Sequence, residues 1–183
     1  MLIRSAVEAD AGEIGSILNA LLGTTTIEWT STPRTAGDVV EWLRAHEVVL
    51  VAEDRGEVVA VAAFGWFRDV VKWPGYRFTV ENTIHVREDR WGSGVAQAMM
   101  EALLERARET GMHVMIAAVD AGNEPSIRLH KRLGFTEVAR MPEVGAKFGH
   151  WLDLVMLHIS LDERAAPTDE EADAGGSVRG RFP

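Results

Sequence analysis

The sequence predicts a mixed α/β fold in which helices cover both faces of one central sheet. Runs rich in β-branched residues alternate with helical periods, in the order strand, helix, helix, three strands, helix, strand, helix and two strands. The chain has 183 residues, of which 46% are hydrophobic, and this suffices for one domain with its own core. We therefore expect a single domain over residues 1–161.

Hydrophobic periodicity and turn residues place the individual elements. Strands are expected at residues 2–4, 48–53, 58–67, 79–86, 113–119, 135–140 and 151–159, with a loop at 142–149 joining the last two as a hairpin. Helices are expected at residues 10–23, 35–43, 93–110 and 123–134. Asp10 with Glu13 and Thr35 with Asp38 have capping-box spacing, so they should start the first two helices. Residues 68–76 should form a non-helical loop.

The stretch 79–96 joins a strand to a helix through a turn that contains two glycines. Gly92 and Gly94 allow the backbone of the turn to approach a ligand closely. The free amides in the first turn of the helix, together with its dipole, are suited to an anion such as a pyrophosphate. A small-molecule phosphate ligand is a first hypothesis, although Gly-x-Gly before a helix often only closes a tight connection.

Composition excludes several classes of function. The formal net charge is 19 − 28 = −9, which opposes non-specific nucleic-acid binding. The chain has no cysteine, so disulfides and thiol catalysis are excluded and a cytoplasmic protein is the simplest interpretation. No apolar run approaches eighteen residues, so a membrane span is not expected. No two histidines have metal-ligand spacing, and we expect no metal.

The C-terminal segment, residues 162–183, differs from the rest of the chain. It contains six acidic residues against three arginines and almost no large apolar residue. It is also rich in alanine, glycine and proline. We expect an acidic, disordered tail, with residues 165–183 as its least structured part.

Several motifs resemble those of the GNAT N-acetyltransferases. The motifs that carry this resemblance, which covers roughly residues 2–160, are Trp91-Gly92-Ser93-Gly94-Val95-Ala96, the run 123–130 beginning Asn123-Glu124-Pro125-Ser126, and Arg132-Leu133-Gly134-Phe135. Within that superfamily, the phosphinothricin acetyltransferase group is similar at residues 24–26, 79–83, 129–130 and 147–153. The resemblance implies a mostly antiparallel central sheet of GNAT type and acetyl-CoA as co-substrate.

The resemblance also implies which residues bind acetyl-CoA. The turn 91–96 would hold the pyrophosphate, the strand 84–86 would pair its backbone with the pantetheine arm, and Asn123 would bond the same arm. The expected cofactor-binding residues are Ile84, His85, Val86, Trp91, Gly92, Ser93, Gly94, Val95, Ala96, Asn123 and Ser126. Trp91 stands where the family usually has Gln or Arg, and Ala96 where a second glycine is common. Because backbone amides bind the anion, we expect affinity to survive these two departures.

Glu81 and His130 are the candidate catalytic residues. A carboxylate on a strand beside the thioester suits a general base, and without the resemblance Glu81 would be interpreted as a solvated strand carboxylate. His130 aligns with a histidine of the phosphinothricin group; it could protonate the departing thiolate, orient a water or touch substrate, and a helix-surface histidine is an equal alternative. The candidate substrate-binding residues are Thr26, Trp29, Arg77 and Lys147, the last two as partners for an acidic group.

The resulting expectation is acetyl-CoA-dependent N-acetylation of a small amino-acid-like amine, such as phosphinothricin, methionine sulfoximine or methionine sulfone. The amine would attack directly in a ternary complex. The alternatives are another amine, such as a polyamine or a protein N-terminus, or a catalytically silent acyl-CoA-binding module. A homodimer is expected from the resemblance and because Trp66, Trp73 and Trp151 would otherwise face water.

Overall fold

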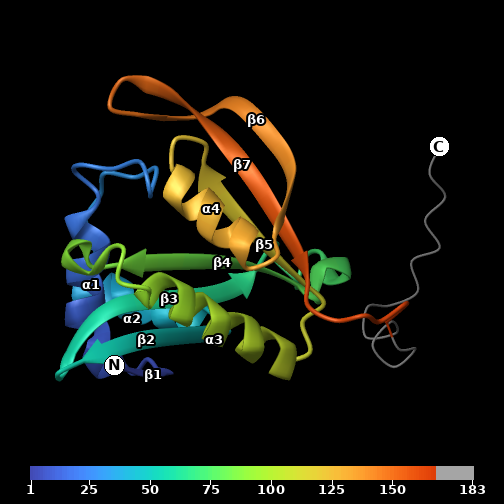
Figure 1. The fold of residues 1–183 in the computed structure, drawn as a ribbon, viewed down its shortest axis with the longest axis horizontal. Helices are drawn as coiled ribbons and strands as arrows, with labels where there is room; N and C mark the ends of the chain where they lie inside the picture. The colour runs from blue at the N-terminus through green and yellow to red at the C-terminus, as the bar shows by residue number, and fades with distance from the viewer. Residues whose placement is uncertain (168–183) are drawn as a thin grey trace.

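The computed structural model describes residues 1–167, whereas residues 168–183 lie outside the described part of the chain. The described residues form seven strands and four α-helices (Figure 1). The strands are β1 (Leu2–Ser5), β2 (Val48–Asp54), β3 (Glu57–Trp66), β4 (Thr79–Val86), β5 (Val114–Asp120), β6 (Thr136–Lys147) and β7 (His150–Ser160). The helices are α1 (Ala11–Ala20), α2 (Ala36–Ala45), α3 (Val95–Glu109) and α4 (Glu124–Arg132).

All seven strands belong to one sheet, in the order β1-β2-β3-β4-β5-β7-β6. Every neighbouring pair is antiparallel except β4 and β5, which are parallel. The mixed, mostly antiparallel sheet expected from the sequence is therefore confirmed. A parallel neighbour requires a crossover connection, and α3 supplies it.

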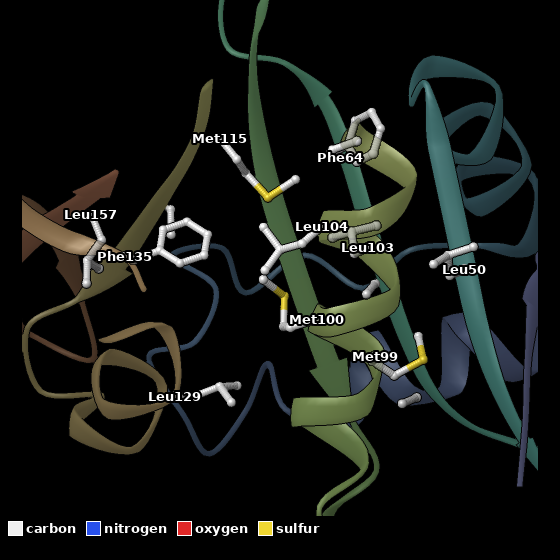
Figure 2. Close-up of a cluster of buried hydrophobic side chains, with 14 of the residues drawn as sticks. Leu50, Phe64, Met99, Met100, Leu103, Leu104, Met115, Leu129, Phe135 and Leu157 are labelled. Atoms are coloured by element: carbon white, nitrogen blue, oxygen red, sulfur yellow. The ribbon is translucent and has the colours of Figure 1, made fainter. Parts of the chain in front are cut away.

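Helices cover both faces of the sheet. In the first half of the sheet, successive residues of a strand point to opposite faces, and both faces carry apolar side chains. In β3, Ala60 and Ala62 belong to the large core cluster under α3, whereas Val61 packs with α1 and α2. Figure 2 shows α3 lying across the sheet, with Met99 and Leu103 among the labelled core side chains. Helix α4 contributes to the same large cluster as α3, so these two helices share a face.

The predicted capping box at the start of α1 does not form, and the structure shows why. The carboxylate of Asp10 accepts two hydrogen bonds from Arg4, at 2.8 and 2.9 Å, and a third from the amide of Val7. Glu13 accepts the amide of Val58 instead of capping the helix. The Arg4 guanidinium holds the pKa of the buried Asp10 carboxyl below its usual range. The second predicted box, Thr35 with Asp38, is confirmed at α2.

The predicted loop at residues 142–149 is wrong, because β6 continues to Lys147. A bulge between Met141 and Gly145 absorbs the residues that resembled a loop, and the amide of Glu143 donates to the carboxylate of Asp153. The actual turn has two residues, Phe148 with φ 52° and Gly149 with φ 77°. Positive φ at both positions is the geometry that favours a tight hairpin.

Two smaller expectations also need correction. Residues 74–76 form one turn of 3₁₀ helix inside the predicted non-helical loop. At the other end of the domain, residues 162–164 contact the body: Asp162 binds His113 at 2.7 Å, and Arg164 donates to the carbonyl of Gly111. The predicted disorder of residues 168–183 lies outside the described residues. Within residues 1–167, no helix has the length and apolar character to cross a membrane.

Candidate active site

The candidate site is an opening between β4 and β5. The two strands pair only from Thr79 with Val114 to Glu81 with Ile116, although β4 continues to Val86 and β5 to Asp120. Beyond Glu81 the two strands no longer pair with each other, whereas β4 stays paired to β3 and β5 stays paired to β7. One backbone edge of each strand is therefore left for another partner.

A cavity of about 760 Å³ includes this opening. Its walls come from both faces of the sheet, because an opening between strands exposes side chains of both sets. Leu21 and Ile27 contribute from the α1 side, and Ser126 and His130 contribute from α4 on the other. A cavity of this volume is large enough for a small-molecule ligand.

The glycine turn at the start of α3 forms one end of the cavity. Gly92 and Gly94 line it with φ of 74° and 88°, a left-handed conformation that favours glycine. No side chain caps α3, so amides of its first turn remain available for an anion. Trp91 also lines the cavity, and its indole N–H donates to the carbonyl of Val86 at 2.9 Å. The ring is thus fixed beside the turn.

Glu81 lies at the closed end of the opening, at the last paired position of β4 and β5. Val86, at the open end, is five positions further along the strand, a distance of about 17 Å. Burial raises the pKa of the Glu81 carboxyl, and the positive charge of Arg68 opposes that shift. The side chain is half-buried and is not part of the cavity wall. A carboxyl with a raised pKa is suited to take up a proton near neutral pH.

His130 is held as a neutral imidazole. Its Nδ1 lies 2.8 Å from the carbonyl of Ser126, which can only accept a hydrogen bond, so Nδ1 carries the proton. Its Nε2 then accepts from the amide nitrogen of Asn82 at 3.1 Å. Burial lowers the pKa of His130, and the bond to Ser126 opposes this. The ring is 1% exposed and packs edge-on against Phe135.

Asn82 and His85, two polar residues of β4, line the cavity, and each has one side-chain atom without a hydrogen-bond partner among the described residues. The carbonyl oxygen of Asn82 is buried and has no partner among the described residues. The Nδ1 of His85 is also buried and without a partner among the described residues. Its Nε2 lies 3.2 Å from the carboxylate of Glu28 and 3.1 Å from the hydroxyl of Thr83. Burial would raise the pKa of Glu28, but hydrogen bonds from His85 and Arg34 lower it overall. Glu28 is therefore a carboxylate that orients His85.

The structure brings most of the predicted cofactor residues and His130 together. The predicted residues that line the cavity are Ile84, His85, Val86, Trp91, Gly92, Gly94, Ala96, Asn123, Ser126 and His130. Asn123 also caps α4 by accepting the amide of Ser126 at 3.2 Å. Ser93 instead donates its hydroxyl to the carbonyl of Arg90, and Val95 is buried in the core.

The four predicted substrate residues do not line the cavity. Arg77 donates to the carbonyl of Pro74 and lies over the ring of Phe78. Thr26 and Trp29 belong to the loop that carries Ile27, which does line the cavity. Lys147 is buried, with its ammonium bonded to carbonyls of that loop. The geometry gives Lys147 partners other than the substrate acid expected from the sequence.

Sequence reasoning missed several polar residues of the cavity wall. These are Arg90, Gln97, Asp120, Arg128 and Arg132. Arg128 and Arg132 are four residues apart and therefore share one face of α4, and this spacing was a usable signal. Arg90 offered no such signal, because its position depends on an ion pair with Asp54 in the β2–β3 hairpin.

The fold and the cavity match a known family. The model of the acetyltransferase (GNAT) family matches residues 15–135, and the chain therefore belongs to the GNAT acetyltransferase family. The resemblance found in the motifs is confirmed. A methionine sulfoximine/methionine sulfone acetyltransferase from Pseudomonas paraeruginosa is 43% identical over 171 residues, which span 90% of this chain and 98% of the relative.

Solved structures agree with this assignment. A Salmonella typhimurium acetyltransferase structure containing its cofactor acetyl-CoA has a TM-score of 0.88 and 39% identity, over 92% of this chain and 98% of the other. A phosphinothricin acetyltransferase from Sinorhizobium meliloti in complex with acetyl-CoA has a TM-score of 0.86 and 28% identity, over 92% and 93% of the two chains. Among residues 1–167, no group of three acidic or histidine side chains is arranged to hold a metal ion.

The geometry of His130 predicts a specific tautomer. In ¹⁵N-labelled protein, Nδ1 should be protonated and Nε2 unprotonated at pH 7, because Ser126 accepts from Nδ1. Burial lowers the pKa, so the neutral ring should persist as pH falls through 6.5, where an ordinary histidine is half charged. A midpoint at or above 6.5, or a proton on Nε2, would contradict the Asn82–His130–Ser126 arrangement.

Proposed function

We propose that this protein transfers the acetyl group of acetyl-CoA to the primary amine of a small amino-acid-like substrate, such as phosphinothricin, methionine sulfoximine or methionine sulfone. The amine attacks directly while both substrates are bound. The observation that carries the proposal is the opening between β4 and β5, whose walls come from both faces of the sheet. The named activities of the relatives support the class of substrate.

The cavity wall fits acetyl-CoA as co-substrate, which supplies an activated thioester. The turn 91–96 and the uncapped amides of α3 are suited to a pyrophosphate. The unpaired edge of β4 suits the pantetheine arm, and the partnerless carbonyl oxygen of Asn82 is a further acceptor beside it. Arg128 and Arg132 add cationic side chains to the α4 wall of the cavity, and Arg128 also pairs with Glu124. In this proposal Asn123 and Ser126 contact the same arm, while Val95 supports the turn from the core.

Glu81 is the proposed general base. An amine like that of lysine has a free pKa of about 10.4, so at pH 7 only ~1 in 2,500 molecules is neutral, which costs roughly 4.6 kcal/mol. Glu81 first accepts one proton of the ammonium, directly or through one water, and this frees the nitrogen lone pair for attack. As the nitrogen–carbon bond forms and the carbon–sulfur bond breaks, the nitrogen loses a second proton to solvent. The thiolate departs and takes a proton from solvent. Burial raises the pKa of Glu81, which brings its proton affinity closer to that task.

His130 acts in this scheme as an orienting group. A neutral ring that accepts at Nε2 has no proton to give there, so its bond with Asn82 fixes the direction of the Asn82 amide. The carbonyl oxygen of Asn82 is thereby turned into a defined acceptor on the cavity wall. This orientation of Asn82 was not among the roles expected for His130 from the sequence, and the geometry argues against acid catalysis by its Nε2.

Release of free CoA with a panel of amines tests the function. The panel contains methionine sulfone, methionine sulfoximine, phosphinothricin, ordinary amino acids, a polyamine and a peptide N-terminus. We expect turnover with the amino-acid-like amines and a heat of acetyl-CoA binding without added metal. Turnover of only the polyamine or peptide would reject the substrate class. Binding of acetyl-CoA with no turnover of any amine would identify a silent binding module instead.

Replacing Glu81 with glutamine should lower the rate without weakening acetyl-CoA binding, because the shape of the side chain is kept and only its proton acceptance is lost. We expect a loss of ~10²- to 10⁴-fold at pH 7, equivalent to about 3 to 5 kcal/mol of barrier. The deficit should shrink as pH rises towards the pKa of the amine, since neutral nucleophile then forms unaided. In the wild type, activity should fall as the pH is lowered and Glu81 becomes protonated. Because burial raises the pKa of Glu81, this loss should begin at a pH above the usual titration range of glutamate.

Glu41→Gln, which changes an exposed carboxylate on α2 away from the cavity wall, is the matched control for charge removal and should retain full activity. A Glu81→Gln variant that is fully active at pH 7 would reject Glu81 as base. So would a deficit that stays constant up to about pH 9.5.

A cytoplasmic homodimer completes the proposal. The chain has no cysteine, which agrees with a reducing compartment. Trp73 is 53% exposed and Trp151 is 70% exposed, so two of the three tryptophans singled out in the sequence do face solvent. Trp66 does not, because it packs against the core. Sedimentation at micromolar concentration should give twice the mass of the chain, and Trp151→Asp should shift it towards monomer; a wild-type monomer would refute the dimer.

A further inference from the structure

A buried lysine at the end of β6 holds the loop between α1 and α2. The Lys147 ammonium donates to the carbonyls of Thr25 and Glu28, at 2.8 and 2.7 Å, although these residues are 122 and 119 positions away in the chain. Lys147 is 6% exposed. In Figure 1 this loop lies below the tip of the β6–β7 hairpin. We call residues 24–30 the acceptor loop.

A second contact from the same strand also holds the acceptor loop. Gly145 lies two residues before Lys147 and so faces the same side of β6. The ring of Trp29 packs directly on it: a methyl group added at Gly145 would overlap the six-membered ring of the indole. The indole N–H of Trp29 points to the carboxylate of Asp120, at 3.4 Å.

The loop is held from the other side by β4. The carboxylate of Glu28 lies 3.2 Å from the Nε2 of His85 and also pairs with Arg34. Between the two carbonyls that Lys147 binds lies Ile27, which forms part of the cavity wall on the α1 side. The position of this apolar wall therefore depends in part on Lys147 and Gly145, which do not line the cavity.

Lys147 has the contacts of an anchor and lacks those of a substrate ligand. It does not line the cavity, and no carboxylate of the described residues lies within ion-pair distance of its ammonium. Two of its three N–H groups are already bonded to backbone carbonyls. A buried ammonium needs such partners, because it has lost its hydration.

We propose that Lys147 and Gly145 are specificity-determining positioning residues: they fix the acceptor loop, and with it the wall at Ile27, without touching the substrate. The inference rests on the proposed amine acetylation in this cavity. The glycine turn 91–96, the proposed pyrophosphate site, belongs to another segment, whereas Ile27 is part of the acceptor loop itself. Loss of Lys147 or Gly145 should therefore impair use of the amine more than binding of acetyl-CoA.

The test uses Lys147→Met, which keeps the length of the side chain and removes its donors, and Gly145→Ala, which displaces Trp29 without changing charge. Misplacement of a wall by about 1 Å can cost ~100-fold in rate. We expect both variants to raise the KM of the preferred amine and to lower kcat/KM by about 10- to 100-fold. The dissociation constant of acetyl-CoA should change much less than kcat/KM for the amine, because the glycine turn 91–96 has no contact with Lys147 or Gly145.

The decisive comparison is between the preferred amino acid and its neutral carboxamide. If Lys147 anchors the loop, Lys147→Met should reduce kcat/KM for both compounds by the same factor, and Gly145→Ala should do likewise. If Lys147 instead pairs with the acidic group of the substrate, Lys147→Met should reduce kcat/KM for the amino acid and not for the carboxamide. That result would overturn the proposal. Lys147→Arg, which restores donors, should recover part of the loss.

Hydrogen exchange provides a readout that does not need turnover. Amides of residues 24–30 should exchange faster in Lys147→Met and Gly145→Ala than in wild type, with α3 unchanged. Lys131→Met, an exposed lysine paired with Glu137, is the matched control and should leave both exchange and kinetics unaltered. Unchanged exchange in the acceptor loop would reject the anchor. Faster exchange with no amine acetylated by the wild type would retain the anchor and reject the proposed function.

Discussion

The constraint on which the site depends is the loss of pairing between β4 and β5 beyond Glu81 and Ile116. Each strand keeps its other neighbour, so the sheet stays intact while an opening forms inside it. Backbone groups along that opening are without a strand partner and are therefore available to an extended ligand. The glycine turn of α3 lies at its wide end and Glu81 at its closed end.

Polar side chains around the opening are fixed by neighbours before any ligand arrives. Ser126 orients His130, which in turn accepts from Asn82, and Glu28 orients His85. Asn82 and His85, which line the cavity, each keep one polar side-chain atom without a partner among the described residues. A site built this way loses little free energy to reorganisation when charge develops in it.

Local features of this protein could be predicted from its sequence, whereas contacts between distant segments could not. The order of the elements and the glycine turn follow from periodicity and from residues next to each other. The β6 bulge was missed because Pro142 and Gly145 suggest a loop, and only Asp153 on the next strand supplies the missing hydrogen bond. Lys147 binds two backbone carbonyls, a group that every residue carries, so the sequence gives no sign of which residues are its partners.

The two faces of the cavity are built from separate parts of the chain, and this separation has an evolutionary consequence. The wall on the α1 side comes from a short surface loop, whereas α3, α4 and the glycine turn build the opposite wall. Under the proposed function, substitutions in the loop would alter which side chain of an amine fits and would leave the opposite wall as it was. Descendants of such a scaffold can therefore exchange one acceptor for another through a few changes near Ile27, with no need to reinvent the chemistry.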